Sequence, residues 1–414
     1  MSLPFFSIII PTRNRYETLK YTLLTVLTQG YKDFELIISD NSDPENLSEL
    51  SLIDDYLSDA RVKYYRPDSV LSMSDNWEFA VSKAIGNYLI IFGDDDGLVM
   101  DSLSELYAII QKTNSDIVSW ARIEYSWPDR KPEKYANLMV IPYKGKTGIM
   151  EGRDYIKRVI AYKADYRYLP MFYNSAINKK VVATLKEKTG RVFNSACPDI
   201  YSGYAFAYLQ DNYISVGYPL SINGVSSKSN GAAHDSADES VKVNYWNTFK
   251  SSSIKWPASI PQINTAYLGI AEPFIQASNF FPEIKSYTSR KKIYQIIINN
   301  LESTSEEDLN TKIEKILDSA KDDQNLHKWL ISYFHKIRPR YSSSVINDYE
   351  DKIGFDGSHL ILDGSKFGLQ NVYDVSVFIK RIFGNLKDKD FLKPVSLPLS
   401  IRIRKAAGMI IRKG

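Results

Sequence analysis

The chain has 414 residues, a formal net charge of +3 and 44% hydrophobic residues. This size and apolar content predict two or three globular domains, and the near-neutral charge argues against a nucleic-acid partner. A single cysteine, Cys197, excludes a disulfide framework and a cysteine-rich metal site. The N-terminal residues lack the pattern of a signal peptide, and no run reaches the roughly 20 apolar residues that cross a bilayer. We therefore expect a cytoplasmic protein.

The first hundred residues alternate short apolar runs with helical patterns. Four runs are typical of buried strands: Phe5–Ile10, Phe34–Ser39, Val62–Tyr65 and Tyr88–Phe92. Helical patterns separate them, at Tyr16–Thr28, Leu47–Leu57 and Ser74–Ala84. This alternation predicts a mostly parallel, doubly wound α/β sheet, in which ligands bind at the carboxyl ends of the strands.

Polar clusters directly follow three of these strands, at Thr12–Arg15, Asp40–Ser42 and Asp94–Asp96. The sheet would bring them to one edge. Three adjacent carboxylates repel one another unless a cation or solvent screens them, and their oxygens suit Mg²⁺ or Mn²⁺ with a diphosphate. A solvated acidic turn is the alternative for the aspartates alone. No dinucleotide fingerprint or phosphate loop follows the first strand, which argues against a dehydrogenase or P-loop enzyme.

Three sequence blocks, read in order, resemble glycosyltransferase family 2. They are FSIIIPTRNR, FELIISDNS and NWEFAVSKAIGNYLIIFGDDD, and together they cover roughly Pro4–Leu98. The resemblance implies a GT-A fold, an inverting reaction, a nucleotide-diphosphosugar donor that is most often UDP-linked, and a divalent metal. It also implies that these blocks contact the nucleotide sugar through Pro11, Thr12, Arg13, Arg15, Asp40, Asn76, Asp94 and Asp95.

Three of these positions have a plain structural alternative. Asp40 matches the acidic residue of the family that accepts a hydrogen bond from the nucleobase, and a charge-assisted bond of that kind is strong. Aspartate is equally favoured at turns and helix N-caps. Arg13 and Arg15 fit a surface salt bridge as well as a nucleotide contact.

The resemblance implies a metal site built from Asp94, Asp96 and His234, with Asp96 as the direct ligand. Several GT-A enzymes complete the site with a late histidine, and imidazole is an acceptable ligand for Mn²⁺. His234 follows a loop rich in Ser, Gly and Asn, where a solvated histidine is the alternative. From composition alone, Ser226–Lys228 could close over the diphosphate.

The resemblance places the general base at Asp199. Inverting transfer needs one carboxylate to take the proton of the acceptor hydroxyl as that oxygen attacks the anomeric carbon. A helix N-cap is the alternative role, because a helical pattern begins at this point. The chain departs from the commoner Glu-Asp doublet of the family and has Pro198 before the aspartate.

The rest of the first region continues the pattern with a helix at Asp101–Lys112 and a strand at Asp116–Trp120. A loop or hairpin insertion is expected on the acceptor side at Tyr125–Lys146. It carries three aromatic residues that could stack on a sugar, although packing is the usual role of such residues. They are Trp127, Tyr135 and Tyr143.

Two domains are expected, with residues 1–238 forming the GT-A domain and residues 239–414 a mainly α-helical domain. The second region carries apolar residues at intervals of three and four, although Ser358–Ile379 begins with a strand-like piece. Residues 391–414 are basic and interleaved with isoleucines, which is compatible with peripheral contact with an anionic membrane or with a plain surface helix.

These observations predict an inverting, metal-dependent hexosyl- or deoxyhexosyltransferase of polysaccharide biosynthesis that acts on a saccharide, glycolipid or glycoprotein acceptor. A nucleotidyltransferase acting on sugar phosphates is the alternative enzyme, but its usual glycine-rich first loop is missing. A non-catalytic carbohydrate-binding protein on an inactivated GT-A domain is the third interpretation.

Overall fold

The computed structural model describes residues 3–142, 145–229, 254–265, 267–301, 303, 305–337 and 353–383. His234, Tyr143, the expected boundary at 238/239 and the basic stretch 391–414 lie outside the described residues. Within the described part of the chain, no helix has the length and apolar character needed to cross a membrane.

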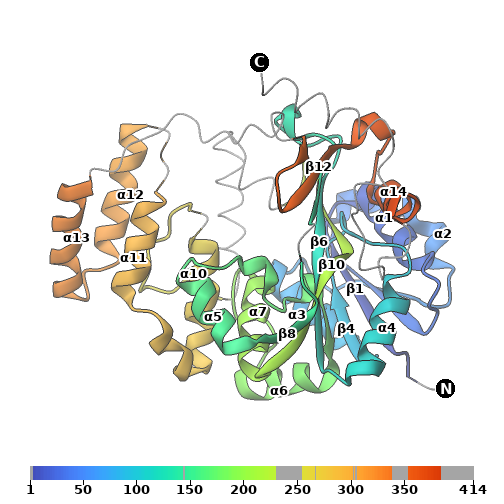
Figure 1. Cartoon of the computed structure of the whole chain (residues 1–414), viewed down its shortest axis with the longest axis horizontal. Helices are drawn as coiled ribbons and strands as arrows, with labels where there is room; N and C mark the ends of the chain where they lie inside the picture. The colour runs from blue at the N-terminus through green and yellow to red at the C-terminus, as the bar shows by residue number, and fades with distance from the viewer. Residues whose placement is uncertain are drawn as a thin grey trace.

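A mixed sheet with helices on both faces organises the described residues (Figure 1). Its first half is parallel and runs in the order β4, β1, β2, β3, with bounds Tyr88–Ile91, Phe6–Thr12, Phe34–Asp40 and Val62–Tyr65. The helices of this half are α1 (Tyr16–Leu27), α2 (Asp54–Leu57), α3 (Met73–Ser82) and α4 (Ser102–Thr113), with a 3₁₀ segment at Pro44–Ile53. The predicted parallel arrangement is confirmed.

Successive side chains of the central strands point to opposite faces of the sheet, so the core has two parts, one on each face. In β1, Ile8 and Ile10 pack with α1 and α4, while Ile9 packs on the opposite face. All three side chains are fully buried. A run of isoleucines is stable here because a strand that is covered on both faces has no solvent side.

The second half of the sheet is mainly antiparallel. Strand β9 (Ser175–Asn178) pairs with β4 and with β6 (Ile117–Ser126), and β7 (Leu138–Pro142) pairs with β6. Strand β10 (Asn212–Val225) runs parallel to β6, whereas β5 (Gly97–Leu98) and β8 (Gly148–Glu151) are antiparallel to β10. The helices here are α5 (Gly152–Ile160), α6 (Lys179–Thr189) and α7 (Pro198–Leu209).

A helical region follows the sheet, as predicted. Its helices are α10 (Leu268–Phe280), α11 (Arg290–Asn299), α12 (Glu306–Asp318) and α13 (Gln324–Ile337). Figure 1 shows α11, α12 and α13 side by side, on the side of α10 away from the sheet. Buried side chains of α10, α11 and α12 continue the core that lies on the α7 face of the sheet. The predicted α/β sheet followed by a mainly helical region is confirmed.

The segment 353–383 returns to the sheet. Strand β12 (His359–Asp363) pairs with β7 and with β11 (Gly354–Phe355), and α14 (Val372–Phe383) packs beside α1 (Figure 1). Ser376 Oγ donates to Leu98 O at 2.9 Å. The sequence-based division assigned this segment to the second domain; its buried apolar side chains lie in the core on the α1 face.

Candidate functional site

The polar residues that follow β1 hold the first aspartate of the acidic turn 94–96. Thr12 Oγ1 donates to Asp94 Oδ2 at 2.7 Å, and Arg15 Nη1 donates to Asp94 Oδ1 at 3.0 Å. The side chain of Asp94 is only 4% exposed, so its ion pair with Arg15 is largely shielded from solvent. Burial would lower the pKa of Arg15, but the charges of Asp94 and Asp95 outweigh it and the pKa is raised. The predicted meeting of these two sequence blocks is therefore present.

The other two aspartates are held by the end of β10. Gly93 N and Gly224 N each donate to Asp96 at 2.7 Å, one to each carboxylate oxygen. Ser226 donates to Asp95 Oδ2 through both its hydroxyl, at 2.6 Å, and its backbone N–H, at 3.2 Å. Because the strand runs on to Val225, its last residues reach this turn.

Burial and mutual repulsion leave negative charge at the turn incompletely balanced. Burial raises the pKa of Asp95, and Asp94 raises it further. Burial and the charge of Asp95 raise the pKa of Asp96 well above its ordinary value, although two backbone N–H groups and Arg122 act in the other direction. A cation bound here would reverse this effect, because it favours the ionised carboxylates.

The carboxylates of the acidic turn are the candidate ligands for a metal ion. Among the described residues, no group of three or more His, Cys, Asp or Glu side chains is arranged to hold a metal ion. Mg²⁺ is usually bound through one or two carboxylates, with water and substrate phosphates as its other ligands. Asp95 and Asp96 fit that pattern. All three carboxylates already accept hydrogen bonds, and Asp94 in addition forms an ion pair with Arg15, so Asp95 and Asp96 are the two that have no cationic partner bonded to them.

The predicted nucleobase residue Asp40 lies one strand away, opposite Thr12 in the register of β1 and β2. It is fully buried, and its carboxylate accepts hydrogen bonds from the hydroxyls of Tyr16 and Tyr64 and from Ser42 N. Its contact with a base stays a prediction. A base that bonds Asp40 directly would have to displace or share one of these donors.

Three other predicted nucleotide-binding residues have internal partners or lie in the strand itself. The side-chain amide of Asn76 bonds Ser39, which fixes α3 to β2. Arg13 pairs with Asp43 at 3.0 Å and its side chain is 47% exposed, which matches the salt-bridge alternative. Pro11 forms part of β1, opposite Ser39. Nucleotide contacts for these residues remain predictions.

Asp199 lies in the first turn of α7, directly after Pro198. Cys197 is the N-cap residue, and its side chain makes no capping bond. A carboxylate in the first turn interacts favourably with the helix dipole. Burial raises the pKa of Asp199, while the backbone N–H of Ile200 and the charge of Arg122 lower it. A raised pKa makes the ionised carboxylate a better proton acceptor, which suits a general base.

Two residues that the sequence reasoning missed link Asp199 to the acidic turn. Burial raises the pKa of Tyr173 well above its ordinary value, and Asp94–Asp96 and Asp199 all raise it further. Arg122 acts electrostatically on both Asp96 and Asp199. Arg122 interrupts the largely buried strand β6, and an arginine in such a strand is a signal that could have been followed.

Trp127, a candidate for sugar stacking, is 6% exposed and donates through Nε1 to Asp95 O at 2.9 Å. The ring is therefore packed beneath the acidic turn and fixes its backbone. Tyr135, the second candidate, lies in a short 3₁₀ segment and approaches Arg130 and Lys134.

A hydrogen bond to helix α10 of the helical region holds the loop before Asp199 in place. Ser195 Oγ donates to Glu272 Oε2 of α10 at 2.5 Å and accepts from Cys197 N at 3.0 Å. Ser74 Oγ of α3 donates to Ser195 O at 2.7 Å. Glu272 is 1% exposed, and burial raises its pKa to about 7.

From the raised pKa of Glu272 we expect the protein to become less stable as the pH rises from about 4.5 to 7. Over this range the folded state keeps a proton on Glu272 that the unfolded state has lost, so the free energy of unfolding falls by up to about 3 kcal/mol. Glu272→Gln should remove this dependence in urea unfolding at pH 5 to 8. The matched change Glu314→Gln, on the exposed face of α12, should retain it. An unchanged slope in Glu272→Gln would contradict the assignment.

Comparison with known proteins gives a family match and several relatives. The family model described as Glycosyl transferase family 2 matches residues 7–178. Poly(ribitol-phosphate) beta-N-acetylglucosaminyltransferase TarP of Staphylococcus aureus is 35% identical over 115 residues, and GalNAc(5)-diNAcBac-PP-undecaprenol beta-1,3-glucosyltransferase of Campylobacter jejuni is 31% identical over 114 residues. Each match covers 27% of this chain and 35% of the relative, so the chain spans about a third of the length of these curated relatives.

Among solved structures, the crystal structure of S. aureus TarS 1–349 in complex with UDP-GlcNAc is similar with a TM-score of 0.47 and 12% sequence identity. The alignment covers 83% of this chain and 95% of that one.

Proposed function

We propose that this chain, whose residues 7–178 match the family model Glycosyl transferase family 2, transfers a sugar, with inversion, from a nucleotide-diphosphate donor to a saccharide or polymer acceptor. One observation carries the proposal: Arg122 and Tyr173 each act electrostatically on both the buried acidic turn 94–96 and Asp199. The acidic turn, which we assign to the diphosphate, and Asp199, which we assign as the general base, are thus near one another. The two curated relatives are also sugar transferases by name, which supports the reaction class.

In the proposed reaction, a hydroxyl oxygen of the acceptor attacks the anomeric carbon of the donor. The bond from that carbon to the diphosphate oxygen breaks, and its electron pair leaves with the diphosphate. Asp199 takes the hydroxyl proton, so no covalent intermediate on the protein is needed. Its raised pKa makes the ionised carboxylate a stronger base.

For the donor, we assign the nucleotide to the carboxyl ends of β1 and β2, beside Pro11, Thr12, Arg13, Arg15, Asp40, Asn76 and Asp94. UDP is the first candidate nucleotide. Asp95 and Asp96 would hold Mg²⁺ or Mn²⁺, as their environment allows, and His234 stays a candidate ligand. Such an ion supplies charge that stabilises a leaving diphosphate.

The test is to incubate the purified full chain with UDP-GlcNAc, other UDP-hexoses and GDP-mannose, with Mg²⁺, Mn²⁺ or EDTA. We expect slow release of the nucleoside diphosphate from one or a few donors, and loss of that release in EDTA. Release of pyrophosphate from a nucleoside triphosphate and a sugar phosphate would favour a nucleotidyltransferase instead. Failure to turn over or bind any nucleotide, while the chain binds saccharides, would favour the non-catalytic alternative.

A further inference from the structure

Arg122 is a partly buried cation without a hydrogen bond to any residue that the structure describes. It lies in the middle of β6, opposite Ser221 of β10. Its side chain is 10% exposed, and its ion pair with Glu124 is 3.7 Å long, beyond hydrogen-bond distance. A guanidinium offers five N–H donors, and those of Arg122 are left for solvent or a ligand. Among the described residues, the N–H donors of Arg122 therefore have no hydrogen-bond acceptor and can bind one supplied by a ligand.

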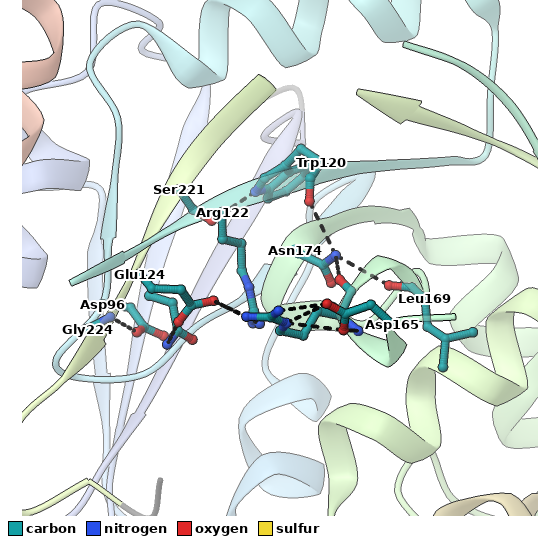
Figure 2. A network of polar contacts seen from close by, with 11 residues as sticks. Asp96, Trp120, Arg122, Glu124, Asp165, Leu169, Asn174, Ser221 and Gly224 are labelled. Carbon is teal, nitrogen blue, oxygen red and sulfur yellow. Dashed lines mark hydrogen bonds and ion pairs between the residues drawn. The ribbon is translucent and has the colours of Figure 1, made fainter. Parts of the chain in front are cut away.

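The neighbours of Arg122 are otherwise satisfied by one another. Arg167 donates to Asp165 through Nε and Nη2 at 2.7 to 3.1 Å, and Asn223 Nδ2 donates to Glu124 Oε2 at 2.8 Å. Figure 2 shows the side chain of Arg122 between those of Glu124 and Asp165, with Asp96 beyond Glu124. The network fixes the surroundings of Arg122 but leaves its donors available.

The position of Arg122 points to an anion of the donor. Its charge lowers the pKa of both Asp96 and Asp199, so it lies near both, yet among the described residues it forms an ion pair with neither. In the proposed function, the diphosphate lies at the acidic turn and the attacking hydroxyl lies at Asp199. The bond that breaks is then between these two groups, and Arg122 lies near both of them. A planar guanidinium matches the oxygens of a phosphate group.

We propose that Arg122 binds a phosphate oxygen of the donor diphosphate between Asp96 and Asp199, and stabilises the negative charge that grows on the diphosphate as its bond to the sugar breaks. This inference rests on the proposed function and adds a binding residue to it. When the bond breaks, its electron pair stays on the phosphate oxygen. A fixed N–H donor in a buried site bonds that oxygen more strongly than it bonds the intact donor.

The experiment compares Arg122→Gln, Arg122→Lys and the wild-type chain by calorimetric binding of UDP and GDP with Mg²⁺, and of uridine and guanosine. We expect Arg122→Gln to weaken binding of the preferred nucleoside diphosphate about 10- to 100-fold and to leave the nucleoside unchanged. Donor hydrolysis without acceptor should fall at least as much. Arg122→Lys should recover part of the lost binding and part of the lost hydrolysis, because lysine restores the positive charge but not the planar guanidinium that donates two parallel hydrogen bonds.

The control is Arg290→Gln in the helical region, where Arg290 bonds Asp322 at 2.8 Å. It should leave diphosphate binding unchanged. Melting curves of all variants identify any that are unfolded, and Arg122→Lys keeps the test valid if Arg122→Gln is one of them.

Three outcomes would overturn the inference. If the Arg122 variants bind the diphosphate and hydrolyse the donor like wild type, Arg122 does not contact the donor. If only transfer to an acceptor falls, Arg122 serves an anionic acceptor instead. If the wild-type chain binds neither UDP nor GDP and hydrolyses no donor, the proposed function itself fails, and that result is seen before any variant is compared.

Discussion

Asp199→Asn is expected to lower kcat by about 10²- to 10⁴-fold while donor binding stays close to that of the wild type. The amide has nearly the same shape as the carboxylate but cannot take up the acceptor proton. The fold should be kept, because the carboxylate of Asp199 forms no ion pair with the residues that the structure describes. Initial rates over a range of donor and acceptor concentrations, with calorimetric donor binding, measure the two effects separately.

The control for this variant lies beyond the other end of α7. Asp211→Asn makes the same chemical change in a side chain that is 78% exposed and pairs only loosely with Arg153, at 3.4 Å. It should retain full activity. If Asp199→Asn keeps more than about a third of the wild-type kcat, Asp199 is not the base and its position reflects only the helix dipole.

Gly224→Ala is expected to disrupt the site through the backbone. A Cβ atom on Gly224 would lie 1.7 Å from Asp95 O and 2.7 Å from Trp127 Nε1, so β10 must move away from the acidic turn. That movement weakens the bonds from Gly224 N to Asp96 and from Ser226 to Asp95. Bonds to charged groups contribute about 1.5–3 kcal/mol each, and overpacking costs about 1–3 kcal/mol.

The free energy of unfolding should therefore fall by about 4–6 kcal/mol in Gly224→Ala, with a melting temperature lower by about 10–20 °C. Nucleoside diphosphate binding should fall at least about 100-fold at a temperature where the variant is folded. Gly148→Ala is the matched control, because a Cβ on Gly148 meets nothing within 4 Å. A Gly224→Ala variant that melts and binds like Gly148→Ala would refute the close approach of β10 to the turn.

Much of the parallel half of the sheet could be predicted from the sequence, because its signals are local. The run of isoleucines in β1, the helical spacing of α1 and the polar residues directly after β1 are each readable within a dozen residues. The rule that parallel strands end at one edge then brings Thr12 and Arg15 to Asp94. The bonds among these three side chains confirm that step.

The partners of Asp95 and Asp96 could not be predicted in this way. Gly224 and Ser226 lie some 130 positions further along the chain, in a stretch that resembles a polar loop. They reach the turn because β10 continues along β6, and the register of such a pairing is decided by burial and hydrogen bonding across the sheet. An arginine among the apolar residues of β6 could have marked Arg122 as unusual, but its role depends on which groups the neighbouring strands present.

By itself, the sequence determined the parallel half of an α/β sheet with helices after it, and it determined which residue types follow the first strands, because short-range periodicity and turn residues encode both. Only the tertiary structure decided that β10 and Trp127 hold the acidic turn, that Glu272 of the helical region supports the loop before Asp199, and that 353–383 packs in the core on the α1 face. Each of these depends on contacts between segments far apart in the chain, whose free energy comes from shared burial and carries no local pattern.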